Sequence, residues 1–541
     1  MRREIEDIFY SLVKIRTDTN TIYEKNIESF YNSFFQNIEY FKKKNDYYGF
    51  YPIDKDPLGR NIFWALVKGS GSDTIIFINH YDVVDVEDFK ILKNYAFSPE
   101  EVEKKLLMIR EELPEEARED LDSGQYIFGR GTADMKAGIA IQLALLKRYS
   151  ELENLHGNIL FLSVPDEENL SAGMRGAIEL LDELNNRFDL KYILTINSEP
   201  HQRVKKDTGV ISEGSVGKIM PFIYVRGYLS HAGKVFEGFN PVSLLSRIVS
   251  KTELNLGLSD FIENEASPPP TWLHFKDSKN HYDVSMPLGA YGYMSIQNLN
   301  RDPVMVIDDI KKICMEAFSE LIEYMNASYE KYCRNIKRAY NPLAWQPKVV
   351  TYKELYDEAY ANYGDAFVNS YKCALKEAKS KVASGQKSMA DVNLYLVERI
   401  FDFIDDLNPR VVIGLAPPYY PNVSNINIEN LDTRIKRLSE DIIRYAMEKF
   451  NQPYEREYFF TGISDLSYTY IKNGEEVAES LKGNMPLYGS IYSIPLDKIE
   501  KYSMPCINIG PWGKDFHKLT ERVLKEDLFY RTPSILNYVI S

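Results

Sequence analysis

Residues 74–82 read TIIFINHYD, an apolar run that ends in a histidine, a tyrosine and an aspartate. The apolar part predicts a buried strand, and residues 159–164 and 192–196 have the same character. Between these strands, residues 137–150 and 171–185 each carry one apolar stripe at helical spacing. Strands that alternate with helices predict an α/β fold with a largely parallel central sheet.

The pattern changes after Gly214, which indicates a second domain inserted into the first. The chain has 541 residues, about three to four times the size of a typical domain. Strand-like and helical segments follow in a β-α-β-α order, long helical segments fill 311–408, and the Pro-rich segment 416–421 marks the way back. We expect an α+β insertion enlarged by helices. The expected ranges are 1–213 and 416–541 for the first domain and 214–415 for the inserted one.

The composition excludes several classes of protein. Lys and Arg number 65 against 79 Asp and Glu, a formal charge of −14, which argues against a nucleic-acid binder or an anchor to anionic lipid. No apolar run approaches the roughly 18 residues of a membrane span, and the N-terminal residues lack the apolar core of a signal peptide. The four cysteines have no CxxC spacing, so we expect neither a disulfide framework nor a cysteine zinc site, and we expect a cytoplasmic location.

Four polar clusters follow predicted strands or open a helix, where ligand sites in open α/β sheets lie. His80 and Asp82 are two positions apart in an extended chain, so both side chains can face one site. The other clusters are the turn GRGTADMKAG at 129–138, the acids DEE at 166–168 and the segment NSEP at 197–200. Acids at the ends of buried strands repel one another and resist burial unless a cation binds them. Imidazole and carboxylate ligands together suit Zn²⁺, Mn²⁺ or Co²⁺.

A helix cap or a surface acid is the alternative for any one of these carboxylates, and Asp166 in particular fits that alternative. The joint order of HxD, GRGxxDxKxG, DEE and SEP is much harder to obtain from capping alone, so we favour a metal site. A second imidazole is available downstream, at His517 in GPWGKDFHKLTERV.

With these motifs the sequence resembles the M20 metallopeptidases, and within them the RocB-like subgroup linked to arginine utilisation. The resemblance covers the first 230 and the last 80 residues. It implies a zinc-peptidase-like catalytic domain with two divalent ions, Zn²⁺ first and Co²⁺ or Mn²⁺ as alternatives. Carried across by motif, the ligands are His80, Asp134 and Glu199 for one ion, and Asp134, Glu168 and His517 for the other. Glu167 would be the general base and acid, Asp82 would orient His80, and the Asp134–Met135 peptide would be cis.

The inserted domain resembles the lid of that family and carries further motifs of it. His231, in SHAG, would polarise the scissile carbonyl, often from the partner subunit. Asn240 and Arg301 would bind substrate, although Asn-Pro is also an ordinary helix start and Arg301 is equally well explained as a surface arginine. The turn GISD at 462–465 would line the site.

Two insertions depart from the family pattern, at 88–124 and within the lid at 311–408. Within the first, residues 98–121 are charge-dense and helical, and we interpret them as a solvated surface rather than a partner site. Family members imply a homodimer through the lid, whereas the second insertion could cover the pairing edge and leave a monomer. Substrate and oligomeric state therefore stay open.

We expect a hydrolase that uses a metal-activated water to cleave an amide or peptide bond in a small N-acyl amino acid or a short peptide. Carboxypeptidase or dipeptidase action on the same site is one alternative. A non-catalytic metal-containing binding protein is another, but it would have lost the base or a ligand, and this sequence keeps all of them. We expect no nucleic-acid or membrane partner.

Overall fold

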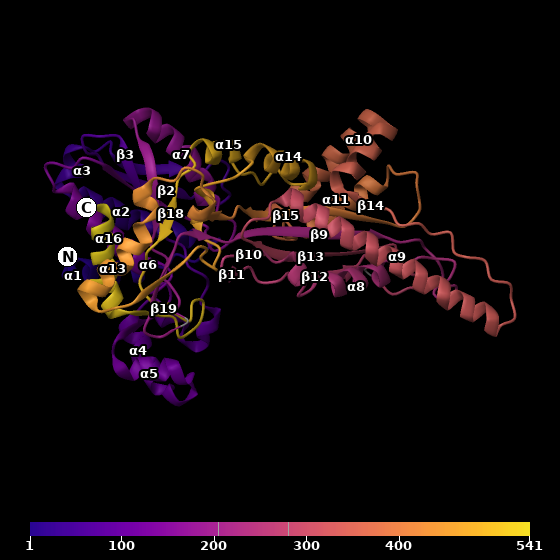
Figure 1. The fold of residues 1–541 in the computed structure, drawn as a ribbon, viewed down its shortest axis with the longest axis horizontal. Helices are drawn as coiled ribbons and strands as arrows, with labels where there is room; N and C mark the ends of the chain where they lie inside the picture. Colours follow the sequence, from indigo (N-terminus) through magenta and orange to yellow (C-terminus); the bar gives the residue numbers. More distant parts are fainter. Residues whose placement is uncertain (204, 280) are drawn as a thin grey trace. The chain divides into compact units, whose positions relative to one another are not determined.

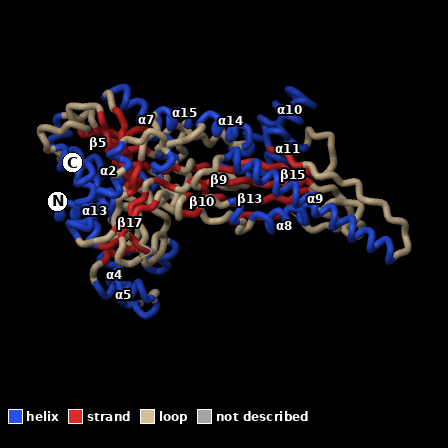
Figure 2. The backbone as a smooth tube through the Cα atoms, in the orientation of Figure 1, coloured by secondary structure: helices blue, strands red, loops and turns tan. Residues whose placement is uncertain are grey.

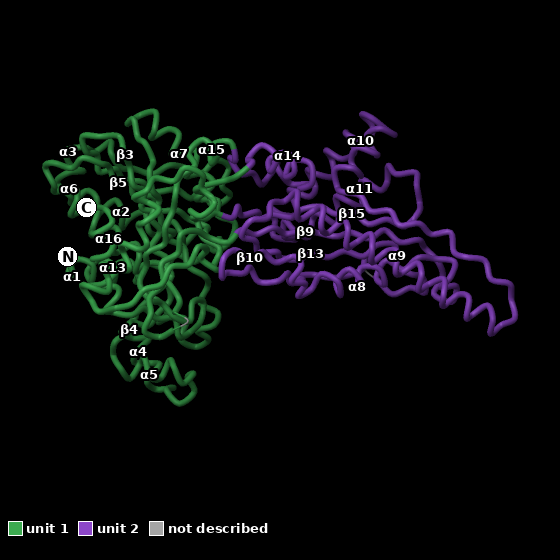
Figure 3. The backbone as a smooth tube through the Cα atoms, viewed as in Figure 1, with its two compact units in different colours: residues 1–216, 423–472, 497–541 green, residues 217–422, 473–496 purple. Residues whose placement is uncertain are grey.

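The computed structural model describes residues 1–203, 205–279 and 281–541. The chain divides into two compact units, coloured separately in Figure 3. Unit 1 comprises residues 1–216, 423–472 and 497–541, and unit 2 comprises residues 217–422 and 473–496. The sequence places 473–496 in the first domain, whereas the structure groups this segment with unit 2.

Unit 1 is built on an eight-stranded mixed sheet, whose strands β2, β3 and β18 are labelled in Figure 1. In spatial order its strands are β1 (Tyr48–Pro52), β2 (Asn61–Val67), β5 (Asn158–Val164), β3 (Asp73–His80), β6 (Lys191–Asn197), β18 (Cys506–Asn508), β7 (Gly209–Ser212) and β17 (Tyr454–Glu457). The four central strands β5, β3, β6 and β18 run parallel to one another. The prediction of an α/β fold with a largely parallel sheet is confirmed.

Helices cover both faces of this sheet, which explains why its central strands are apolar on both sides. On β2, Phe63, Ala65 and Val67 belong to the core that contains α6 (Lys136–Ser150). The alternate side chains of β2 point to the opposite face, where α7 (Ala172–Phe188) packs. Further helices of unit 1 are α1 (Arg2–Val13), α2 (Ile27–Gln36), α3 (Glu39–Lys43), α4 (Pro99–Met108), α5 (Glu115–Ser123), α12 (Thr433–Lys436), α13 (Leu438–Phe450), α15 (Leu496–Lys501) and α16 (Thr532–Ile540).

A small three-stranded sheet extends unit 1 beside the main one. Its order is β19 (Gly513–Lys514), β20 (Arg522–Leu524) and β4 (Tyr126–Phe128), all antiparallel. β19 and β20 form the hairpin that carries His517, and β4 directly follows the insertion 88–124. The segment that returns from the insertion therefore pairs with the His517 hairpin.

Unit 2 is a five-stranded sheet with helices on both faces. In order the strands are β12 (Thr271–Asp277), β13 (Gly289–Asn298), β9 (Gly217–Arg226), β15 (Arg410–Tyr420) and β14 (Val349–Thr351). The helices are α8 (Pro241–Thr252), α9 (Pro303–Asn335), α10 (Tyr352–Ala383), α11 (Val392–Phe401) and α14 (Gly474–Asn484). Figure 2 shows these strands in red and the helices in blue. Phe222 and Tyr224 of β9 lie in the core formed with α10 and α11, while α8 contacts the strands β9, β13 and β12.

The first part of unit 2 ends at Asn422, next to the Pro-rich segment expected to mark the way back, but the last strand there is longer than the sequence indicates. The Pro-rich segment 416–421 reads as a break in the sequence, but β15 continues through it to Tyr420. Pro417–Pro418 is a cis peptide, and the pairing register with β9 shifts between Ala416 and Tyr420. The two prolines are accommodated at this irregularity because no regular ladder hydrogen bond is required of them there.

Two findings concern the chain as a whole. Among the described residues, no helix has both the length and the apolar character needed to cross a bilayer. All four cysteines carry free thiols, and Cys373 is the exposed one.

Candidate metal centre

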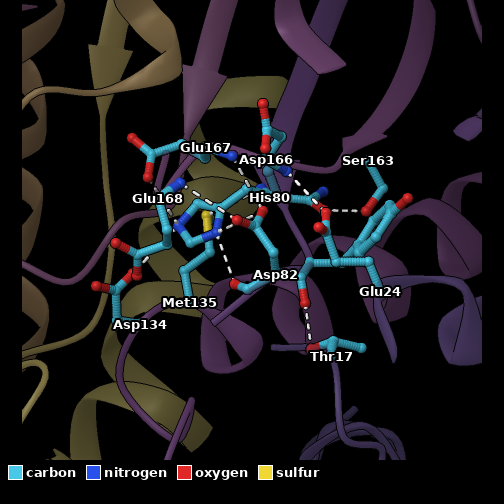
Figure 4. Close-up of polar contacts among 12 residues, drawn as sticks. Thr17, Glu24, His80, Asp82, Asp134, Met135, Ser163, Asp166, Glu167 and Glu168 are labelled. Atoms are coloured by element: carbon cyan, nitrogen blue, oxygen red, sulfur yellow. Dashed lines mark hydrogen bonds and ion pairs between the residues drawn. The ribbon is translucent and has the colours of Figure 1, made fainter. Parts of the chain in front are cut away.

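The predicted ligand side chains lie at one edge of the main sheet. β3, β5 and β6 run parallel, so their carboxyl ends meet there. His80 is the last residue of β3, the DEE segment follows β5, and Glu199 follows β6. Figure 4 shows His80 with Asp82, Asp134, Glu167 and Glu168 around it.

His80 is buried and is held from both ring nitrogens. Its Nδ1 donates to the backbone carbonyl of Asp82 at 3.0 Å, which leaves Nε2 for a ligand. Nε2 lies 3.1 Å from Asp134 Oδ1 and 3.1 Å from Glu199 Oε1. The carboxylate of Asp82 is farther from Nδ1, at 3.7 Å, so Asp82 orients His80 through its main chain.

The carboxylate of Asp82 instead holds the DEE segment. Its Oδ1 accepts the backbone N–H of Glu167 at 3.1 Å, and its Oδ2 accepts that of Glu168 at 3.2 Å. Because Asp82 is fully buried, these two bonds fix where the two glutamates leave the main chain. One aspartate thus orients the histidine, the expected base and the expected ligand together.

Asp134 precedes α6 and sits between the two histidines. Its Oδ1 faces His80, and its Oδ2 lies 3.3 Å from His517 Nε2. The Asp134–Met135 peptide is cis, as the family resemblance implies. The first turn of α6 approaches Ser198, the residue after β6, so closely that a Cβ on Gly138 would lie 2.3 Å from its carbonyl oxygen. Glycine at 138 therefore lets Asp134 and Glu199 come together.

His517 completes the constellation from the β19–β20 hairpin. Its Nε2 lies 3.1 Å from Glu168 Oε1 as well as near Asp134. Unlike His80, its side chain is half exposed, and its backbone is left-handed at φ 62°. No described residue hydrogen-bonds its Nδ1, so the hairpin and the two carboxylates at Nε2 set the place of this ring.

These side chains form two triads that share Asp134. The triads are His80, Asp134 and Glu199, and Asp134, Glu168 and His517, each with ligand atoms within 4.8 Å of one another. In a tetrahedral zinc centre with bonds of about 2.0 Å, ligand atoms lie roughly 3.3 Å apart. The four histidine–carboxylate separations are 3.1 to 3.3 Å. The donor set and its spacing fit two divalent ions bridged by Asp134.

The electrostatics of the protein without cations point the same way. Burial raises the pKa of Glu167 well above its usual range, while the charge of His80 acts to lower it. Burial likewise raises the pKa of Glu199 to about 7. Hydrogen bonds to Asp134 and Glu168 raise the pKa of His517 to about 10. Raised pKa values at these two glutamates and at the histidine mean that all three bind protons more tightly than usual. This indicates a surplus of buried negative charge, which divalent cations would neutralise.

Sequence reasoning missed the residues that support Asp134. Glu521 Oε1 accepts the backbone N–H groups of Ala133 and Asp134, at 3.2 and 3.3 Å. Its other oxygen binds Arg130 Nη1 at 2.6 Å, and Arg130 Nη2 binds Asp88 at 2.6 Å. Arg130 lies inside the glycine-rich motif at 129–138, and this position was the one signal in the sequence for its role. Glu521 lies in a loop and looks like any surface acid.

Asp166 and Asp465 take different places around the centre. Asp166 pairs with buried Arg60 at 2.7 Å and accepts the N–H of Ala172, the first residue of α7, so it supports the helix start and joins neither triad. Asp465 is buried, and neither of its carboxylate oxygens has a partner among the described residues. Its charge contributes to the raised pKa of Glu167, which places the 462–465 turn beside the centre.

The three remaining predicted residues belong to unit 2. His231 is exposed, and its Nδ1 accepts the N–H of Gly233 at 3.0 Å, so a neutral ring carries its proton on Nε2. Asn240 caps α8, where its Oδ1 accepts the N–H of Val242 at 3.0 Å. The guanidinium of Arg301 binds Asp260 at 2.8 Å and Asp309 at 2.5 Å, which favours a structural role within unit 2.

Among the known proteins that resemble this chain, two match it over nearly its whole length. The uncharacterised protein YqjN of Bacillus subtilis (strain 168) is 30% identical over 543 residues, which cover 99% of this chain and 96% of YqjN. The protein RocB of the same organism is 29% identical over 548 residues, which cover 98% of this chain and 93% of RocB.

Solved structures resemble the chain along its full length. The M20 family metallo-carboxypeptidase Sso-CP2 from Sulfolobus solfataricus superposes with a TM-score of 0.52 at 13% identity, covering 99% of this chain and 98% of that one. Human carnosine dipeptidase 1 gives 0.50 at 11% identity, covering 100% and 96%. At these identities the likeness confirms the fold, a zinc-peptidase-like domain interrupted by a lid. The family model for peptidase family M20/M25/M40 matches residues 76–436, and the chain therefore belongs to this family of metal-dependent hydrolases.

Proposed function

We propose that this protein hydrolyses an amide or peptide bond in a small N-acyl amino acid or a short peptide. The observation that carries the proposal is the pair of triads sharing Asp134, with Glu167 beside them but in neither. Glu167 Oε2 lies 3.9 Å from His80 Nε2, against 3.1 Å for the ligand oxygens of Asp134 and Glu199. A carboxylate set back in this way can act on a water rather than hold an ion.

The triads would hold two divalent ions, for which we propose Zn²⁺ first and Co²⁺ or Mn²⁺ as alternatives. When bound, such ions lower the pKa of a water toward neutrality and polarise a carbonyl oxygen. Glu167 then takes the proton of the attacking water and passes it to the nitrogen of the leaving amine. Asp82 keeps Glu167 in place through its bond to the backbone N–H. The family resemblance implies that His231 would polarise the oxygen of the scissile carbonyl.

The substrate class rests on the family and its relatives. Similarity to RocB supports a role in arginine utilisation. The names of the structural relatives, a carboxypeptidase and a dipeptidase, make these activities the first alternatives on the same site. We propose that Asn240 and Arg301 bind substrate. Removal of either side chain should then raise KM. Their contacts inside unit 2 give each of them a structural role already.

We also propose that the protein forms a homodimer through β12. This strand is at one edge of the unit 2 sheet, and no described strand pairs with its outer side. The helical insertion contributes β14 to the opposite edge, while α10 and α11 cover one face. An unpaired edge can pair with its twin across a two-fold axis.

A substrate screen tests the proposed activity. Metal-free protein is loaded in turn with Zn²⁺, Mn²⁺ and Co²⁺ and assayed on a panel of N-acyl amino acids, dipeptides and longer peptides. We expect turnover with at least one ion and one panel class, and loss of turnover in a Glu167→Gln variant. A protein that cannot be loaded with any divalent ion would contradict the proposal outright.

A further inference from the structure

The insertion 88–124 is packed against the hairpin that carries His517. Val102, Leu106 and Ala117 of the insertion form a small core with Phe128 of β4 and Leu524 of β20. These insertion side chains are fully buried. The insertion is therefore part of the packed structure of unit 1 at this hairpin, in addition to the solvated face expected from its charge.

One acid of the insertion makes ion pairs to both strands of the hairpin. Asp120, on α5, binds Arg522 Nε of β20 at 2.7 Å and Lys514 Nζ of β19 at 2.8 Å. Glu116, one turn earlier on α5, binds Lys514 at 3.0 Å. The side chains of Arg522, Lys514 and Asp120 are 1%, 10% and 13% exposed, so solvent screens these pairs less than surface ones.

Arg522, which binds Asp120, also binds residues of the loop between β19 and β20. Its Nη1 binds the carboxylate of Asp515 and donates to the backbone carbonyl of Thr520 at 3.0 Å. The Thr520 hydroxyl donates to Asp515 at 2.8 Å. His517 stands between these residues, so Asp120 and Arg522 together close the loop that presents its ring.

The backbone conformation of the loop between β19 and β20 indicates that contacts from outside the loop stabilise it. Asp515 and His517 both adopt left-handed backbone conformations, at φ 54° and 62°, which are uncommon for non-glycine residues and cost free energy that surrounding contacts must offset. The His517 ring is half exposed, whereas His80 is buried and bonded at Nδ1. Contacts between the insertion and the hairpin therefore fix the position of His517, whereas burial and the Nδ1 hydrogen bond fix that of His80.

We propose that Asp120 is a positioning residue for His517, so that the insertion 88–124 sets the affinity of the Asp134–Glu168–His517 triad for a divalent ion. The inference rests on the proposed metal-dependent function. It is specific to one triad, because Asp120 contacts the hairpin and neither His80 nor Glu199.

Asp120→Asn is the main test variant, since it removes the charge and keeps the shape. The fold should survive, because Arg522 keeps Asp515 and Lys514 keeps Glu116 as partners. Glu119→Gln is the matched control, an exposed acid on the same helix. Glu116→Gln is a milder second variant, which removes one partner of Lys514.

Cobalt titration followed by visible absorption measures the two positions in turn. The wild type and Glu119→Gln should bind two Co²⁺ per chain. In Asp120→Asn one of the two steps should weaken about tenfold, a magnitude usual for residues that orient metal ligands, and the other should keep its affinity. Glu116→Gln should shift the same step by less. Two steps like those of the wild type, or an equal loss at both, would overturn the inference.

Hydrogen exchange of the metal-free protein gives a readout independent of any ion. The amides of 513–522 should exchange faster in Asp120→Asn than in the wild type or in Glu119→Gln, with the rest of unit 1 unchanged. Unchanged exchange in the hairpin would overturn the inference while leaving the proposed function intact. A wild type that binds no Co²⁺ would instead overturn the proposed function, and with it the metal part of the inference.

Discussion

Glu167 and Glu168 are neighbours in the chain, but their surroundings assign them different roles. Glu168 lies 3.1 Å from His517 Nε2 and belongs to a triad, whereas Glu167 belongs to none. We expect Glu167→Gln to keep both ions and to lower kcat by about 10²–10⁴-fold, because one group serves both proton transfers. We expect Glu168→Gln to lose metal. Elemental analysis and steady-state kinetics of both variants check this, and metal loss in Glu167→Gln would show that the two roles are exchanged.

Asp134 is the one residue common to both triads. We expect Asp134→Ala to lose more metal per chain than either His80→Ala or His517→Ala, since each histidine serves one position only. Metal content by elemental analysis after dialysis gives the ranking. Equal losses in the three variants would mean that Asp134 does not bridge.

Protons and metal ions compete for the same atoms, which fixes the sign of the pH dependence. Hydrogen bonds from Nε2 raise the pKa of His517 to about 10, and burial raises that of Glu199 to about 7. At pH 7 an incoming ion must displace the His517 proton. Apparent affinity should therefore rise with pH between 6 and 8, about tenfold per unit for each proton released.

Calorimetry in two buffers of different ionisation enthalpy counts the protons released on binding. We expect at least one proton per chain at pH 7, and fewer in His517→Ala. An affinity for metal that is flat or falls across this pH range would contradict the assignment of His517 as a ligand.

At the scale of elements, the insertion 88–124 reaches both ligand-bearing segments. Asp88 binds Arg130, which binds Glu521, which in turn holds the backbone N–H of Asp134. Asp120 binds the hairpin of His517. The insertion, which lengthens the stretch between His80 and Asp134, thus contacts the segments that position Asp134 and His517.

The contact of α6 with β6 can be tested at a single glycine. A Cβ on Gly138 would meet main-chain oxygen and the Cβ of Ser198 at 2.3 and 2.9 Å, and neither can move aside cheaply. We expect Gly138→Ala to lower the free energy of unfolding by about 1–3 kcal/mol, as overpacking does, and to weaken metal binding by separating Asp134 from Glu199. Denaturant unfolding of the metal-free protein measures the first effect.

Gly176→Ala is the control, because a Cβ there would meet only side-chain ends, Ile62 Cδ1 at 3.1 Å first. It lies within α7, where alanine favours the helix over glycine. We expect its stability to be unchanged or higher. A Gly138 variant as stable as the Gly176 variant would contradict the close approach.

The sequence predicts elements well where the local pattern and the tertiary role agree. Residues 74–79 and 159–164 are apolar because both faces of β3 and β5 are covered, and the ligands follow these strands directly. The continuation of β15 through 416–421 was not predicted, because two prolines usually end a strand, whereas an irregular pairing accommodates them here. Glu521 was not predictable, since its role depends on backbone N–H groups 387 positions away.

At the scale of the whole molecule, unit 1 is assembled from three separate parts of the chain. The third part supplies β18, which lies between β6 and β7 in the main sheet, and the hairpin with His517. The candidate metal centre is therefore complete only when residues on both sides of unit 2 in the sequence have come together. This explains why the metal-ligand motifs lie on both sides of unit 2 in the sequence.

The oligomeric state follows from the free edge of unit 2. Leu273 and Phe275 of β12 are 53% and 43% exposed, and no described strand covers the outer side of β12. Pairing of two such edges would bury these side chains together. We expect light scattering to give about twice the 62.7 kDa of one chain. Leu273→Lys with Phe275→Lys should give the monomer mass, because like charges would then meet across the two-fold axis. Leu407→Lys, at a leucine outside β12 that is 65% exposed, should stay dimeric. A wild-type mass near 63 kDa across a concentration series would refute the dimer.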